Sequence, residues 1–182
     1  MRTFIALELP DGFAADVAAL ARQLSAEVEG RFMRRESYHL TLAFLGDVDE
    51  AELASAIAAI EDTCPSCNPV PLRADGLGKF GRSSDATLWL GIAPNPELDD
   101  LVYPLRDALV DRGVDFDEKT FKAHITLARR AKLPSGSLPP LEFPRDDSAT
   151  CITVFKSTLE KDGAVYKPLF RYDLEAHRAL PL

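Results

Sequence analysis

The sequence has few of the residues that build disulfide frameworks and metal sites. It holds three cysteines and three histidines among 182 residues. Three cysteines do not make a disulfide framework. Cys64 and Cys67 have the spacing of a redox motif, but they follow a helical pattern instead of opening a helix, and no second cysteine pair exists to complete a zinc site. We therefore interpret the thiols as incidental and expect neither a metal nor a cofactor.

Long apolar runs are also absent. No stretch approaches the ~18 residues of a membrane span, so we expect no membrane partner. Residues 1–8 become acidic at Glu8 and lack a small-residue cleavage site, which indicates a first strand and not a signal peptide. We expect a cytoplasmic protein.

Basic charge is scarce as well. The chain has 21 Lys and Arg against 29 Asp and Glu, a net charge of −8. Broad binding of nucleic acid requires neutralisation of many phosphates, so this balance argues against it. The net charge does not exclude a local binding site for one phosphate. The candidate basic clusters, each of which fits an ordinary solvated surface equally well, are Arg31, Arg34 and Arg35, then Lys79 and Arg82, then Arg129, Arg130 and Lys132.

One short pattern occurs twice. Residues 39–43 read His-Leu-Thr-Leu-Ala and residues 124–128 read His-Ile-Thr-Leu-Ala, 85 residues apart. Side chains of a strand alternate between its two faces. The pattern therefore predicts His, Thr and Ala of each copy on a chemical face and the aliphatic residues on a core face. Strict alternation also predicts Phe44 on the core face.

Duplication makes these histidines candidates for acid–base chemistry. A single strand histidine is more often structural, but two imidazoles with pKa values near ~6.5 can share one proton near neutral pH. A histidine-based metal site is poorly supported, because His39 and His124 lack carboxylate or thiolate ligands at metal spacing.

The paired motifs resemble the two-histidine phosphoesterase superfamily. Within it the sequence is similar to the RNA 2′,3′-cyclic phosphodiesterases, also called 2′-5′ RNA ligase-like proteins. The similarity extends to residues 2–10 and to the segment 87–92, so it covers most of the chain. Ala123 stands where family members often have proline, a departure at the start of the strand that does not touch the chemistry.

The resemblance implies metal-independent hydrolysis of a 2′,3′-cyclic phosphate at an RNA 3′ end, which leaves a 2′-phosphate. It implies that His39 gives a proton to the leaving 3′-oxygen and that His124 accepts one from water. The residue pattern alone leaves that direction open. Thr41 and Thr126 would donate hydrogen bonds to the non-bridging phosphate oxygens.

Two further residues and the partners follow from the same resemblance. Arg129 would contact the phosphate or stack on the base, and Phe44 would lie near the nucleotide. The expected partners are RNA 3′ ends or nucleotides that carry a 2′,3′-cyclic phosphate, and we expect a monomer. Two alternatives stay open: 2′-5′ RNA ligation at the same site, and binding of nucleotides or RNA ends without catalysis.

Periodicity predicts an α+β fold. Asp49 is expected to cap the second helix and Asp162-Gly163 to form a hairpin turn. The resemblance implies two pseudo-symmetric lobes of antiparallel sheet, with outer helices, that face each other across a central cleft in a single bilobal domain, residues 1–182. The expected strands are 2–9, 38–47, 70–77, 87–92, 121–128, 149–161 and 164–174; the helices are 12–28, ended by Gly30, then 50–62 and 96–112; the loops are 78–84 and 131–147.

Overall fold

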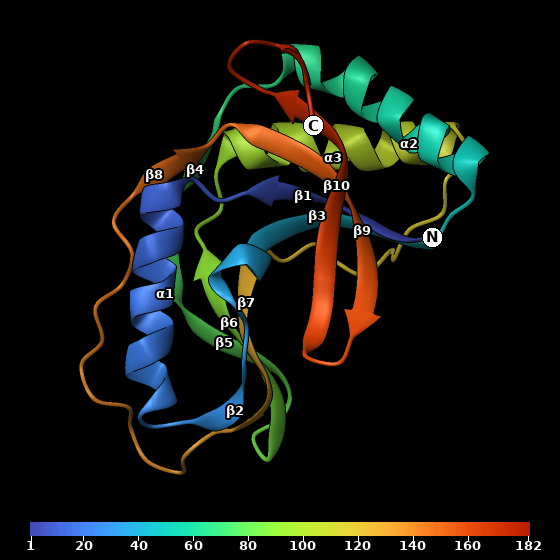
Figure 1. The fold of residues 1–182 in the computed structure, drawn as a ribbon. Helices are drawn as coiled ribbons and strands as arrows, with labels where there is room; N and C mark the ends of the chain where they lie inside the picture. The colour runs from blue at the N-terminus through green and yellow to red at the C-terminus, as the bar shows by residue number, and fades with distance from the viewer.

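The larger of two antiparallel sheets carries the first motif at its edge. The computed structural model describes residues 1–182, and this sheet has the strand order β11-β10-β9-β1-β3 (Figure 1). The strands β9 and β10 form the predicted long hairpin. The bounds are β1 Arg2–Glu8, β3 His39–Asp47, β9 Cys151–Glu160, β10 Gly163–Asp173 and β11 Arg178–Leu180.

The smaller sheet carries the second motif between two neighbours. Its strand order is β2-β7-β6-β5, so β7 is paired on both edges. Strands β4 and β8 pair with each other in a separate two-stranded antiparallel sheet. The bounds are β2 Glu29–Phe32, β4 Val70–Leu72, β5 Ala74–Arg82, β6 Asp85–Ile92, β7 His124–Lys132 and β8 Asp147–Ala149.

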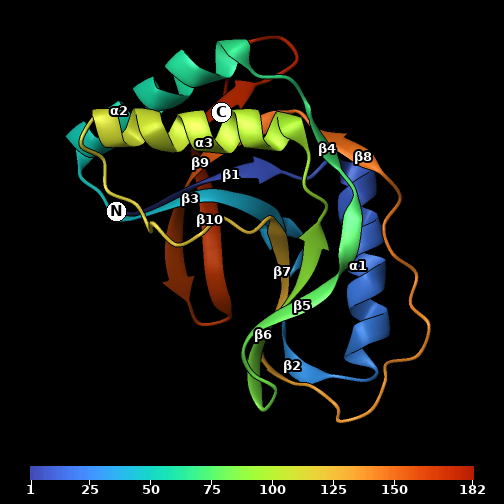
Figure 2. The ribbon, with the colours of Figure 1, turned by 180° about the vertical axis from the view of Figure 1, so that it is seen from behind.

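Three helices cover the outer faces of the sheets. Helix α1 (Asp11–Ser25) lies beside the smaller sheet, whereas α2 (Glu50–Thr63) and α3 (Pro96–Asp111) pack together over the larger one (Figures 1 and 2). Asp49 caps α2 as predicted. Its side chain accepts a hydrogen bond from the Glu52 amide at 2.8 Å, and the Glu52 side chain accepts one from the Asp49 amide. No helix is long and apolar enough to cross a membrane.

The chain passes repeatedly between the two lobes. The first strand joins the larger sheet, α1 and β2 belong to the smaller, and β3 returns to the larger. Each lobe therefore uses segments from the whole length of the sequence. One contiguous apolar core runs through both, and it includes the aliphatic residues of β3 and β7, which lie in contact. This interleaving places the two motif strands next to each other.

The predicted α+β class and opposed sheets are confirmed, but several bounds differ. The first helix ends at Ser25, and Gly30 lies inside β2 instead of ending the helix. The expected strand 70–77 is two strands separated by Arg73. The second motif strand begins at His124 and continues to Lys132, so the segment 121–123 precedes it.

The glycine-rich segment 78–84 is mostly strand and not loop. Strand β5 continues to Arg82 and turns into β6 at Ser83-Ser84. A Cβ atom on Gly78 would lie 2.1 Å from the Trp89 indole, so glycine is needed there for close approach of the ring. The composition that suggested a loop instead makes room for a cross-strand tryptophan.

Candidate active site

The two motif strands share one irregularity. In β3 the pairing with β1 skips Leu42, and in β7 the pairing with β6 skips Leu127. Both residues directly follow the motif threonine. A β-bulge at this position shifts the alternation of all later side chains. The residues five positions after each histidine, Phe44 and Arg129, therefore return to the face that carries the histidines.

This bulge makes part of the predicted facing wrong. Ala43 and Ala128 were expected on the chemical face, yet both are fully buried in the core. Phe44 was expected on the core face, yet it is half-buried and lines the pockets beside the motif residues. Period-two alternation fails here because one extra residue is inserted after the threonine.

Each bulge has a partner for its carbonyl oxygen. In β3, Arg106 from α3 donates from Nε to the Leu42 oxygen at 3.0 Å, and its guanidinium lies over the rings of Phe116 and Phe121 at 5.3 and 5.4 Å. In β7, the Met33 amide donates to the Leu127 oxygen at 2.8 Å. Backbone groups freed by an irregular strand are costly when left unpaired, so these contacts stabilise the bulges.

The two imidazoles are held in the same way. His39 donates from Nδ1 to the Ser37 carbonyl oxygen at 2.8 Å, and His124 donates from Nδ1 to the Lys122 carbonyl oxygen at 2.6 Å. A carbonyl only accepts, so Nδ1 carries the hydrogen in both rings. Nε2 is therefore the nitrogen that is free to take or give a proton.

His39 lies in an aromatic environment. Its ring centroid is 4.7 Å from that of Phe4 and 5.2 Å from that of Tyr166, which meets it edge-on. Burial is the main cause that lowers the pKa of His39 to about 4; the hydrogen bond to Ser37 opposes this shift, and the charges of His124 and Arg129 add to it. In the free protein this ring is neutral at pH 7.

His124 has a different set of neighbours. Its ring lies 5.1 Å from that of Phe80 and 5.8 Å from that of Trp89. Burial also lowers the pKa of His124, with smaller contributions from the charges of Arg129 and Lys122. The ammonium group of Lys122 lies 5.1 Å from the centre of the Trp89 ring.

Two pockets open beside the histidines and share Thr41 and Phe44. The pocket on the His124 side has a volume of about 750 Å³ and is also lined by Phe80 and Lys122. The pocket on the His39 side has a volume of about 450 Å³. Cationic and aromatic side chains that border an adjoining pair of cavities suit a ligand with both a phosphate and a flat ring.

The structure brings most of the predicted site residues together. His39, Arg129, Thr41 and Phe44 line one pocket, and His124 lines the other with the same Thr41 and Phe44. Thr126 is the exception. It is half-buried, pairs with Trp89 of β6, and lines neither pocket.

Sequence reasoning missed several residues that complete the site. Tyr166 reaches His39 from β10, and no local pattern marks it. Arg106 of α3 donates to the β3 bulge, but the sequence of this helix has only an ordinary amphipathic pattern. Arg2 lies over the Phe44 ring, with Cζ 5.0 Å from its centre. Only Phe80 had a signal in the sequence, since it lies between Lys79 and Arg82, one of the candidate basic clusters.

Metal ligands do not gather in this structure. No group of three or more His, Cys, Asp or Glu side chains is placed to hold an ion. Cys64 and Cys67 are buried and Cys151 is half-buried, and all three are free thiols.

Comparison with known proteins gives concordant matches. The family model described as LigT like Phosphoesterase matches residues 7–89. A Thermotoga maritima protein named RNA 2′,3′-cyclic phosphodiesterase is 32% identical over 96% of this chain and 96% of its own length. An Escherichia coli protein of the same name is 30% identical over 95% of this chain and 96% of its own length.

Solved structures agree. E. coli LigT in its apo form superposes with a TM-score of 0.80 at 27% identity, over 94% of this chain and 96% of that one. The same protein complexed with 3′-AMP gives 0.79 at 27% identity, over 100% and 98%. A Thermus thermophilus structure, TT0787, gives 0.81 at 27% identity, over 96% and 98%.

Proposed function

Because the chain belongs to the LigT-like phosphoesterase family, we propose that it hydrolyses the 2′,3′-cyclic phosphate at an RNA 3′ end to a 2′-phosphate, without a metal ion. The observation that carries the proposal is the matched pair of imidazoles, each with Nδ1 bonded to a carbonyl and Nε2 free, beside adjoining pockets. Substrates are RNA ends or nucleotides with this cyclic group, as the names of the relatives and the 3′-AMP complex of E. coli LigT suggest.

The proposed reaction divides proton transfer between the two rings. His124 accepts a proton from water on Nε2 as the water oxygen attacks phosphorus. His39 donates a proton from Nε2 to the 3′-oxygen as its bond to phosphorus breaks. The two rings exchange charge states in one turnover, so the net proton count of the site is unchanged.

The pKa values of His39 and His124 are both lowered, so the source of the proton that His39 donates needs an explanation. Both rings are neutral in the free protein at pH 7, so neither holds the proton that the acid must give to the leaving oxygen. A cyclic phosphate carries a negative charge, and an anion near an imidazole favours its protonated form. We propose that substrate binding raises the pKa of His39 and so charges the ring that protonates the leaving oxygen.

The remaining residues have electrostatic and positioning roles in this proposal. Thr41 lies at the junction of the two pockets, where its hydroxyl donates to a non-bridging oxygen. Thr126 of β7, which lines neither pocket in the free protein, is a second and weaker donor in this proposal. Arg129 balances the phosphate charge, and Phe44 contacts the nucleotide. The threonines and Arg129 act on phosphate oxygens that carry charge in the transition state, whereas Phe44 positions the nucleotide.

Phosphorus NMR of a short oligonucleotide ending in a 2′,3′-cyclic phosphate tests the proposal. With a chelator present, the wild-type protein should convert the cyclic signal to that of a 2′-phosphate, and His124→Ala should leave it unchanged over the same time. A 3′-phosphate product would contradict the regiochemistry. Binding without any conversion would instead indicate a noncatalytic protein that recognises RNA ends.

A further inference from the structure

Two arginines face each other on neighbouring strands beside the proposed site. Arg31 of β2 is the direct cross-strand partner of Arg129 of β7, so both side chains project from the same face of the sheet. Like charges directly opposite each other destabilise a sheet. Neither guanidinium takes part in any ion pair of the structure. No carboxylate of the chain therefore offsets the charge of this pair.

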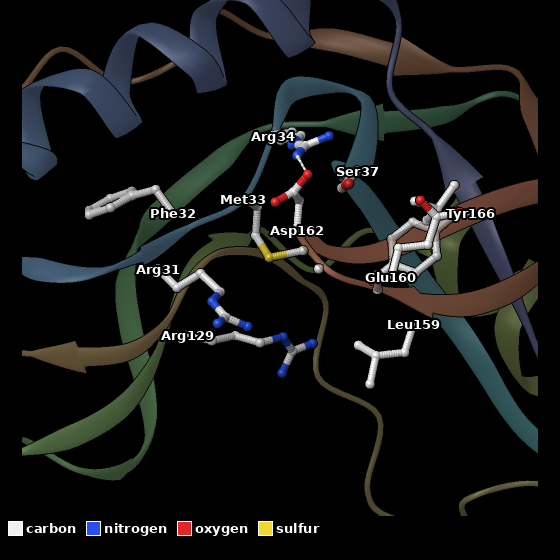
Figure 3. A pocket seen from close by; sticks show the side chains of 13 residues that line it. Arg31, Phe32, Met33, Arg34, Ser37, Arg129, Leu159, Glu160, Asp162 and Tyr166 are labelled. Carbon is white, nitrogen blue, oxygen red and sulfur yellow. Dashed lines mark ion pairs between the residues drawn. The ribbon is translucent and has the colours of Figure 1, made fainter.

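These arginines line a distinct cavity between the lobes. Figure 3 shows their guanidinium groups pointing from the smaller sheet toward Leu159 and the end of the β9–β10 hairpin. The cavity has a volume of about 230 Å³. Pockets that enclose a whole small ligand usually measure ~300–1,000 Å³, so this one suits part of a longer ligand.

The cavity continues into the pocket of His39. The two share Arg129, Leu159, Ala164 and Tyr166 as lining residues. A ligand whose phosphate lies beside His39 would therefore extend directly into the space next to Arg31. Leu159, 83% exposed, forms an apolar wall on the opposite side.

The charge of this cavity differs from that of the whole protein. Three guanidinium groups and two carboxylates line it, on a chain with a net charge of −8. Asp162 is engaged by Arg34 at 3.9 Å, drawn as a dashed line in Figure 3. Glu160 is the other carboxylate and forms no ion pair with Arg31 or Arg129, so the cavity carries a net charge of +1.

We propose that the Arg31–Arg129 pair binds the phosphodiester on the 5′ side of the nucleotide that carries the cyclic phosphate. This rests on the proposed function and narrows its substrate class to the ends of RNA strands, in preference to mononucleotides. A planar guanidinium presents several N–H donors and matches phosphate oxygens in pairs. Arg129 lines both the cavity and the His39 pocket, so it contacts the cyclic phosphate and the second phosphate, whereas Arg31 lines the cavity alone and contacts only the second. The terminal nucleotide then spans from the cyclic group at the histidines to this second phosphate.

Three substrates distinguish binding of the proposed second phosphate from binding of the cyclic phosphate. They are a nucleoside 2′,3′-cyclic phosphate, the same compound with an added 5′-phosphate, and a dinucleotide ending in the cyclic phosphate. For the wild-type protein, kcat/KM should rise about tenfold or more when the 5′-phosphate is added, the usual effect of a hydrogen bond to a charged group. The dinucleotide should keep that gain.

Arg31→Ala should remove the gain and leave the 5′-hydroxyl nucleoside within about twofold of wild type. The salt dependence of kcat/KM for the dinucleotide should weaken by about 0.7 in its logarithmic slope, the effect of losing one phosphate contact. Arg178→Ala is the matched control, because it removes the same charge from exposed β11 at the other edge of the larger sheet. It should change none of the three values.

Equal loss of kcat/KM on all three substrates would overturn the proposal, because Arg31 would then act on the catalytic centre or the fold. So would a wild-type protein that gains nothing from the 5′-phosphate. If the wild-type protein turns over none of the compounds, the proposed function fails separately. Calorimetric affinities for the three compounds then decide the matter: an Arg31-dependent gain supports the second phosphate site, and its absence overturns it.

Discussion

Strands β3 and β7 share a backbone plan and differ in what surrounds it. Both begin with a histidine bonded through Nδ1 to the carbonyl two residues earlier, and both have a bulge after the threonine. His39, however, lies among Phe4 and Tyr166, whereas His124 lies beside Phe80 and the charged Lys122. The shared features fix which nitrogen faces the substrate, and the differing neighbours set how readily each ring holds a proton.

The bulge brings a different kind of side chain to the cleft in each of the two strands. It brings an aromatic ring, Phe44, to the cleft from β3 and a cation, Arg129, from β7. In the proposed function, one motif would therefore present a surface for a nucleoside and the other a charge for a phosphate. An apparently duplicated site becomes asymmetric at one position of each copy, and that asymmetry fits a substrate whose two ends differ.

Removing either imidazole should have the largest effect. His39→Ala and His124→Ala should each lower kcat on a 2′,3′-cyclic phosphate by ~10²–10⁴-fold, the usual contribution of a positioned acid or base. Circular dichroism should show that both variants fold. Turnover within tenfold of wild type for either variant would remove that ring from the chemistry.

The two threonines should differ. Thr41 lies where both pockets meet, while Thr126 lines neither, so Thr41→Val should lower kcat by ~10–100-fold, as expected for a lost hydrogen bond to a charged oxygen. Thr126→Val should cost less. Equal losses measured under saturating substrate would mean that binding draws Thr126 into the site and restores the symmetry of the motifs.

Loss of the contact to the β3 bulge should have a smaller effect. Arg106→Ala removes the donor to the Leu42 oxygen, so Phe44 should lose its fixed position and kcat/KM should fall by about tenfold, a change near ~1.4 kcal/mol. Arg178→Ala is the matched arginine control and should leave kcat/KM unchanged. Unaltered kcat/KM in Arg106→Ala would mean that the bulge forms without its partner from α3.

Stability should depend on pH through His39. Its pKa is about 4 when folded and ~6.5 when unfolded, so the unfolded chain binds a proton that the folded protein excludes between these values. The stability associated with the neutral ring is therefore present above pH ~6.5 and lost as pH falls toward 4, by roughly 3 kcal/mol at most. Urea unfolding from pH 7 to 4 measures it, and His39→Phe should flatten the dependence. An equally steep dependence in His39→Phe would assign it to other groups.

Local sequence patterns predicted the helices, most of the strands and the two matching strands that carry His39 and His124, because the causes of these features are local. Asp49 caps α2 through residues three positions away, and the His-x-Thr spacing is a property of a single strand. The bulges could not be predicted, since a skipped pairing depends on the partner strand. The Arg31–Arg129 pair requires β2 and β7 to meet across almost 100 residues of sequence, and Tyr166 reaches the site from another sheet strand.

The division of roles between the two strands is tested most directly by changing the leaving group. A phosphodiester with a 4-nitrophenolate leaving group needs no proton from an acid, whereas a cyclic phosphate does. If His39 is the donor and His124 the acceptor, His39→Ala should lose most of its defect in kcat on the activated ester, and His124→Ala should keep its full defect. The reverse pattern would exchange the roles, and equal recovery in both variants would contradict a divided acid–base pair.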